Sequence, residues 1–139
     1  MLFRSLEWRG ATLINDCYNS NPAALSAMVD ALMAIPAERH IVVAGEMLEL
    51  GPEAEALHAG CGLRMAEHGV DFVLGVRGAA GATVIAAERG GAEGLFVASA
   101  EEAGEWLVAN VRAGDVVLLK ASRGVRLERA LTVIANGSQ

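Results

Sequence analysis

The sequence predicts an α/β fold in which a mostly parallel sheet is covered by helices on both faces. Short apolar runs alternate along the chain with longer helix-like segments, which is the pattern of consecutive βαβ units. Runs such as 40–45 (HIVVAG) and 115–120 (DVVLLK) are continuously hydrophobic, as expected for strands that are buried on both sides. The expected architecture is therefore a Rossmann-like three-layer sandwich, with one antiparallel hairpin at an edge of the sheet.

The N-terminal segment predicts that hairpin. Residues 2–8 (LFRSLEW) and 11–16 (ATLIND) are strand-like, and apolar and polar residues roughly alternate in the first of them. Arg9-Gly10 between them suits a tight turn, because glycine tolerates backbone conformations that other residues avoid. We therefore expect an antiparallel N-terminal pair.

The first helix is predicted by its start signal and by its periodicity. Asn21 is a favourable N-cap, and Pro22 suits the first helical position. The apolar positions that follow recur with helical spacing: Leu25, Met28, Val29 and Leu32. Pro36 lies just beyond the expected end of the helix.

The remaining chain alternates strands and helices. We expect further strands at 40–45, 71–76, 94–98 and 115–120. We expect further helices at 53–68, 79–89, 99–111 and 124–135, and a loop at 46–53. Ser99 and Glu102 form a capping-box pattern at the start of the third of these helices.

Composition narrows the possible functions. The chain has 139 residues and is 53% hydrophobic, which favours one globular domain over residues 1–139. Its net charge is −6 and its aromatic content 4%, so neither an extended nucleic-acid surface nor a stacking platform for single strands is expected. No apolar run is long enough to predict a membrane span. The two cysteines, Cys17 and Cys61, form neither a disulfide framework nor a CxxC zinc motif, which favours the cytoplasm.

Polar residues follow the second strand, at the place where ligands bind in open α/β sheets. The stretch 16–21 (DCYNSN) joins that strand to the first helix. Asp16 can accept hydrogen bonds from ribose hydroxyls, and Ser20, Asn21 and the free amides of the helix start can face a nucleotide. The alternative is that Asn21 only caps the helix and Asp16 only braces the turn.

A second candidate site follows the last strand. Lys120, Ser122 and Arg123 lie between that strand and the expected start of the last helix. An ammonium, a hydroxyl and a guanidinium in such a place would hold a carboxylate or a phosphate, because arginine offers a bidentate fork and the helix start adds amide donors. The alternative is a solvated strand end.

The other patterns in the sequence are weaker indications of a functional site. His58 lies on a predicted helix, where a packed structural histidine is the more common reading. The glycines of 75–81 form GxxGxxG, which is a weak indication of a dinucleotide site. The sequence contains no GxxxxGK[ST], GxSxG or HExxH motif. The chain therefore has the character of one part of an active site.

Four sequence features together resemble the C-terminal domain of the Mur ligase family. They are DCYNSNP (16–22), GEMLELG (45–51), His58 and LLKASRGVRLE (118–128), in the order and spacing of the family pattern. The resemblance runs from about residue 3 to 135 and is strongest to the branch that adds D-Ala-D-Ala to UDP-MurNAc-tripeptide. The chain departs from the family pattern at four positions: Asn15, Cys17, Ser20 and Ala121. The methyl group of Ala121 replaces a glycine where backbone could approach a ligand closely.

The resemblance implies a ligase of three domains, of which this chain is the third. An N-terminal domain for the UDP-sugar substrate and a central P-loop ATPase domain would be its partners in the same polypeptide. ATP and Mg2+, bound mainly by the central domain, would phosphorylate the tripeptide carboxylate, and the dipeptide amine would attack the acyl phosphate. The C-terminal domain would close this site and would be inactive alone, so no catalytic residue and no metal ligand are expected within it.

The resemblance also assigns roles by position. Asp16 would contact the ATP ribose, and the nucleotide side of the cleft would be lined by Tyr18, Asn19, Ser20 and Asn21. Lys120, Ser122 and Arg123 would lie near the incoming dipeptide. His58 and Glu49 match family positions to which no role is assigned.

Two further hypotheses stay open from the residues alone. One is a free-standing Rossmann-like module that binds a nucleotide or another small ligand, and the other is an interaction domain with an exposed apolar rim. The ligase hypothesis requires Asp16 and Arg123 to lie on the same edge of the sheet.

Overall fold

The computed structural model describes residues 4–16, 21–120 and 128–137 and confirms the predicted α/β class. The strands are β1 (Arg4–Trp8), β2 (Ala11–Asp16), β3 (Arg39–Gly45), β4 (Phe72–Val76), β5 (Glu93–Val97) and β6 (Asp115–Lys120). The helices are α1 (Pro22–Met33), α2 (Ala54–Glu67), α3 (Ala80–Arg89), α4 (Ala100–Asn110) and α5 (Glu128–Gly137), with a short 3-10 turn at Gly51–Glu53.

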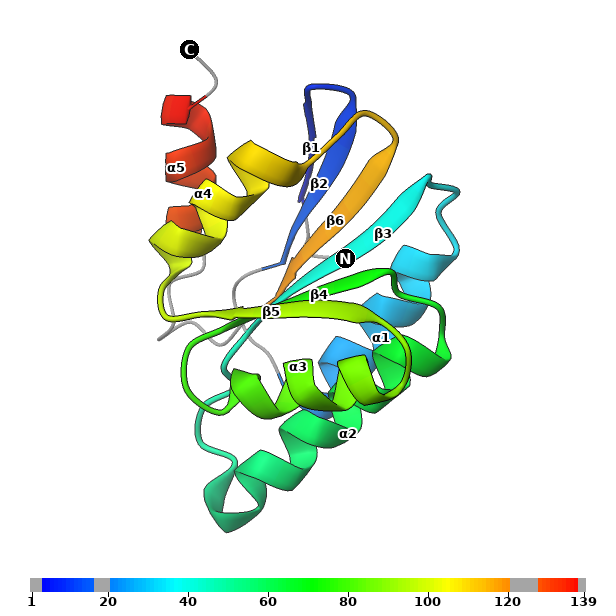
Figure 1. Cartoon of the computed structure of the whole chain (residues 1–139), viewed down its shortest axis with the longest axis vertical. Coiled ribbons are helices and arrows are strands. Elements are labelled where there is room, and N and C mark those ends of the chain that lie inside the picture. The colour runs from blue at the N-terminus through cyan, green and yellow to red at the C-terminus, as the bar shows by residue number, and fades with distance from the viewer. Residues whose placement is uncertain (1–3, 17–20, 121–127, 138–139) are drawn as a thin grey trace.

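The strands form one six-stranded sheet in the order β1-β2-β6-β3-β4-β5. Only the β1–β2 pair is antiparallel among these described strands, and it lies at one edge as predicted. Figure 1 shows α1, α2 and α3 on one side of the sheet and α4 and α5 on the other. Strand β6, the last in the chain, lies between β2 and β3, so residues distant in sequence meet at the centre of the sheet.

The alternation of side chains along the strands explains the continuous apolar runs. In β3, Ile41 and Val43 pack in the core formed with α4 and α5, whereas Val42 and Ala44 pack in the core formed with α1 and α2. Because successive side chains of a strand point to opposite faces, a strand covered on both sides must be apolar at every position. All four of these side chains are buried.

The hairpin and its turn follow the sequence signal. Trp8 pairs with Ala11 across the β1–β2 turn. Arg9 and Gly10 between them have φ of 53° and 82°, the left-handed backbone that a two-residue hairpin of type I′ requires. The positive φ at Gly10 costs little because glycine has no Cβ.

Both predicted helix caps are present. The side chain of Asn21 accepts a hydrogen bond from the backbone N–H of Ala24 at 2.9 Å. Ser99 Oγ accepts one from the backbone N–H of Glu102 at 3.1 Å, and it also lies 3.4 Å from the Glu102 carboxylate. The first residues of α1 and α4 are therefore fixed by side chains that the sequence identified.

The last helix differs in its end from the prediction. Helix α5 runs to Gly137, two residues beyond the predicted end at 135, while its predicted start at 124 lies outside the described residues. Its Ala130 and Ile134, which lie within the predicted part of the helix, are buried in the core shared with α4. Within the described ranges, the helices are too short or too polar for any of them to span a lipid bilayer.

Candidate functional site at the carboxyl ends of the strands

The carboxyl ends of the parallel strands meet at one edge of the sheet. Asp16 of β2 and Ala44 of β3 both pair with Lys120 of β6, and Gly45 pairs with Val76 of β4. We call this edge, with the segments 46–53 and 77–79 that follow β3 and β4, the rim. Ligands of open α/β sheets bind at such an edge, because loops and helix starts converge there.

Asp16 and Lys120 form an ion pair at the centre of the rim. Lys120 Nζ lies 2.7 Å from Asp16 Oδ2, and the two side chains are 5% and 16% exposed. The pair joins residues that are 104 positions apart in the chain. In the described part of the chain, Lys120 donates a hydrogen bond to the Asp16 carboxylate through Oδ2. Lys120 therefore orients the carboxylate, in addition to any ligand contact of its own.

Several predicted site residues lie outside the described part of the chain. They are Tyr18, Asn19, Ser20, Ser122 and Arg123. The placement of Asp16 and Arg123 on one edge therefore stays a prediction, although Lys120, three positions before Arg123, lies beside Asp16. Asn21 is exposed and caps α1, as the alternative interpretation expected, and its contact with a nucleotide stays a prediction.

Glu46 organises the turn that follows β4, and sequence reasoning missed it. Its Oε2 accepts a hydrogen bond from the backbone N–H of Ala79 at 3.0 Å, and its Oε1 lies 3.5 Å from Arg77 Nε. Arg77 and Gly78 both have left-handed backbones, with φ of 72° and 53°, and a Cβ at Gly78 would collide with the Glu46 carboxylate. Gly78 of the glycine pattern at 75–81 therefore belongs to a turn packed on Glu46, a contact that the sequence alone does not indicate.

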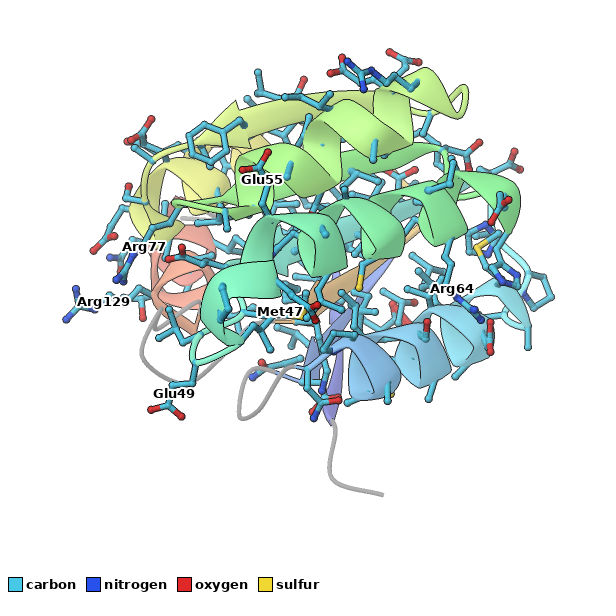
Figure 2. The ribbon with its side chains drawn as sticks, turned by 90° about the horizontal axis from the view of Figure 1, so that it is seen from below. Met47, Glu49, Glu55, Arg64, Arg77 and Arg129 are labelled. Atoms are coloured by element: carbon cyan, nitrogen blue, oxygen red, sulfur yellow. The ribbon has the colours of Figure 1, made fainter. Side chains whose placement is uncertain are left out.

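His58 and Glu49, which had no assigned role, have different environments. His58 is fully buried, and both of its ring nitrogens are hydrogen-bonded. Glu49 is exposed and has φ of 63°. Figure 2 shows the Glu49 side chain pointing away from the body of the protein, on the loop after β3. The segment 46–53 is thus anchored inside the protein and presents a carboxylate at its tip.

A second, partly buried ion pair lies at the amino ends of β3 and β6, opposite the rim. Arg39 donates to both carboxylate oxygens of Asp115, at 3.0 and 2.6 Å, and the backbone N–H of Arg112 donates at 2.8 Å. Burial, the largest influence, acts to raise the pKa of Asp115, but the hydrogen bond from Arg39, the Arg112 amide and both positive charges outweigh it and lower the pKa. The hydrogen bond to Asp115 raises the pKa of Arg39. This pair stabilises the fold far from the rim.

Neither thiol chemistry nor a metal centre is indicated in the described residues. Cys61 is buried, and burial raises the pKa of its thiol, so the reactive thiolate is disfavoured. The described part of the chain holds no group of three His, Cys, Asp or Glu side chains able to bind a metal. The Asp16 carboxylate, held by Lys120, is a hydrogen-bond acceptor at the rim.

The fold and the rim define a class of protein, and comparison with known families identifies it. The family described as "Mur ligase, glutamate ligase domain" matches residues 3–123, and the chain belongs to this family. Within it, the chain is similar to the UDP-N-acetylmuramoyl-tripeptide–D-alanyl-D-alanine ligase of Bacillus subtilis (strain 168). The two are 32% identical over 123 residues, which is 86% of this chain and 27% of the relative.

Two further relatives agree with this result. The ligase of the same name from Mycobacterium leprae (strain TN) is 36% identical over 138 residues, covering 85% of this chain and 26% of the relative. The crystal structure of the MurF ligase from Thermotoga maritima in complex with ADP superposes with a TM-score of 0.80 at 28% identity. The match covers 97% of this chain and 30% of that structure. The chain therefore spans about a quarter of the length of the curated relatives it matches.

Proposed function

We propose that this chain is the C-terminal domain of an ATP-dependent ligase that joins D-Ala-D-Ala to UDP-MurNAc-tripeptide in cytoplasmic peptidoglycan precursor synthesis. The observation that carries the proposal is that 86% of the chain aligns with a UDP-N-acetylmuramoyl-tripeptide–D-alanyl-D-alanine ligase, of which it covers only 27%. The match to a MurF ligase in complex with ADP supports a nucleotide as one of the ligands.

The proposal includes the domain organisation. Residues 1–139 form one domain, and its partners are an N-terminal domain for the UDP-sugar substrate and a central P-loop domain of the same polypeptide. The lack of a P-loop motif in the sequence suits a domain that docks onto a triphosphate site built by another domain. We expect the isolated chain to be inactive for this reason.

The residues of the rim would bind and orient substrates. When bound, ATP supplies the phosphoryl group that activates the tripeptide carboxylate, and Mg2+ neutralises charge on its phosphates. Asp16, held by Lys120 at 2.7 Å, would accept a hydrogen bond from the ribose through Oδ1. Tyr18 to Asn21 would line the nucleotide side, and Ser122 and Arg123 would hold the carboxylate of the dipeptide through a hydroxyl and a bidentate fork. Closure of the rim would exclude water and bring the amine to the activated carboxylate.

The test is ligase activity in the polypeptide that carries this domain. Phosphate release should require ATP, UDP-MurNAc-tripeptide and D-Ala-D-Ala together. Arg123→Ala should lower kcat/KM roughly a hundredfold through loss of substrate positioning. Arg89→Ala is the matched control, because Arg89 is exposed at the end of α3 distant from the rim, and its activity should stay within about twofold of the wild type. Normal turnover by Arg123→Ala would contradict the proposal.

Isothermal titration separates this proposal from the free-standing module. The 139-residue chain alone should show no micromolar binding of ATP, because the triphosphate site belongs to another domain. Micromolar binding of ATP by the chain alone would favour the free-standing nucleotide-binding module instead.

A further inference from the structure

We propose that His58 is a positioning residue that fixes the rim segment 46–53 for binding of the incoming dipeptide. The inference rests on the proposed function and gives a role to a fully buried histidine that the substrate contacts above do not use.

The two ring nitrogens of His58 tie the rim segment to the start of α2. Nε2 accepts a hydrogen bond from the backbone N–H of Met47 at 2.8 Å. Because Nε2 accepts, Nδ1 carries the proton and donates to the carbonyl of Ala54, at 2.6 Å. Met47 itself is 2% exposed, so its amide has no solvent to replace this partner. The imidazole therefore spans the loop from its second residue to the first residue of the helix.

The position of Met47 affects two glutamates of the rim, one before it and one after it in the chain. Glu46, directly before Met47, holds the turn after β4 through the backbone N–H of Ala79 and through Arg77. Two residues after Met47, Glu49 has a left-handed backbone and an exposed carboxylate. Displacement of Met47 would therefore move Glu46 and Glu49 together, although neither touches His58 in the described contacts.

The order of strands predicts which substrate depends on this anchor. Strand β3, which leads into the segment, lies beside β6, and its Ala44 pairs with Lys120 at the start of the stretch assigned to the dipeptide. Strand β2, which carries Asp16 on the nucleotide side, lies on the other side of β6. A shift of residues 46–53 should therefore weaken binding of D-Ala-D-Ala more than binding of ATP.

Two near-isosteric substitutions separate the two hydrogen bonds. In His58→Asn the amide nitrogen can take the place of Nδ1 and donate to Ala54, but nothing reaches Met47. In His58→Gln the amide oxygen can take the place of Nε2 and accept from Met47, while the donor to Ala54 is lost. The inference requires the Met47 bond, so the asparagine variant should be impaired and the glutamine variant should not.

The first experiment is steady-state kinetics in the ligase that carries this domain. His58→Asn should raise KM for D-Ala-D-Ala about tenfold, with kcat and KM for ATP within about threefold of the wild type. His58→Gln should keep all three within about threefold. Equal effects of the two variants, or an equal rise in KM for ATP, would overturn the inference. If the asparagine variant does not fold, a tenfold rise in dipeptide KM for the folded His58→Gln enzyme would overturn it.

Thr83→Val is the control for a general loss of stability. Thr83 is buried on α3, and its hydroxyl donates to the backbone carbonyl of His58 at 3.0 Å, so the valine variant loosens the α2–α3 contact and leaves both ring hydrogen bonds in place. It should lower the stability of the fold without changing dipeptide KM. A tenfold rise in dipeptide KM for this variant would show that stability alone accounts for the effect.

A second experiment distinguishes failure of this inference from failure of the proposed function. Amide hydrogen exchange in the 139-residue chain measures directly how well the Met47 N–H is protected by its hydrogen bond to His58. Exchange at Met47 should be at least about tenfold faster in His58→Asn than in His58→Gln. If the ligase does not use D-Ala-D-Ala, the proposed function fails, while this exchange pattern still supports the anchor. If exchange at Met47 is the same in both variants, the anchor itself is refuted.

Discussion

The ion pair of the rim makes a quantitative prediction about stability. Lys120→Met removes the cation that lies 2.7 Å from Asp16 and leaves a carboxylate that is only 16% exposed. Breaking a fully buried pair costs about 3–5 kcal/mol, whereas exposed pairs contribute about 0–1 kcal/mol. Because Asp16 keeps partial access to solvent, we expect Lys120→Met to cost about 2–3 kcal/mol. Asp16→Asn should cost about 1–2 kcal/mol, because the amide oxygen still accepts from the lysine.

A double-mutant cycle isolates the interaction of the two residues. The double variant Asp16→Asn/Lys120→Met should be less destabilised than the sum of the single variants by at least about 1 kcal/mol, because neither charge is left alone. Urea unfolding of the 139-residue chain at pH 7 gives all four free energies. The exposed pair of Arg129 and Glu101, 3.6 Å apart with both side chains 52% exposed, is the matched control and should show a coupling below about 0.5 kcal/mol. A coupling of Asp16 and Lys120 near zero would refute the pairing on which the rim is built.

Two further predictions concern the fold. Asp115 has its pKa lowered below the ordinary 3.8, so the stability it contributes is present above pH 3.8 and is lost as pH falls through its pKa in the folded state. Arg39→Met should therefore cost about 2–3 kcal/mol at pH 7, and this cost should shrink as the pH approaches 3.8, because protonation relieves the unpaired carboxylate. A cost independent of pH would contradict the assignment. Gly62→Ala should destabilise by about 1–3 kcal/mol in urea unfolding, since its Cβ would collide with the Thr83 carbonyl. Gly60→Ala, with no atom within 4 Å of its Cβ, should stabilise by about 0.5–1 kcal/mol, and equal effects at the two glycines would refute the close α2–α3 contact.

Local signals in the sequence predicted most of the fold. Asn21 and Ser99 mark helix starts because a cap is a contact between near neighbours in the chain. The continuous apolar run of β3 predicted burial on both sides, and alternation of residues such as Val42 and Val43 between two cores explains it. Asp16 and Lys120 both end predicted strands, and they lie side by side in the structure because the carboxyl ends of parallel strands meet at one edge.

The features that sequence reasoning missed depend on contacts between distant segments. The role of Glu46 depends on a turn more than thirty residues further on, where Arg77 and Gly78 adopt positive φ. His58 was expected to be structural, but its partners Met47 and Ala54 follow from the way the loop folds back on α2. Neither periodicity nor motif spacing specifies such a fold-back. The family resemblance identified the positions and left their physical roles to the structure.

The dependence of ligase kinetics on Asp16 tests the central claim most directly. In the proposed function, this rim completes a nucleotide site of another domain through one carboxylate, that of Asp16, which is held by Lys120. In the ligase that carries the domain, Asp16→Asn should raise KM for ATP about tenfold and change KM for D-Ala-D-Ala by less than about threefold. An unchanged KM for ATP, in a variant that folds and turns over D-Ala-D-Ala normally, would contradict it.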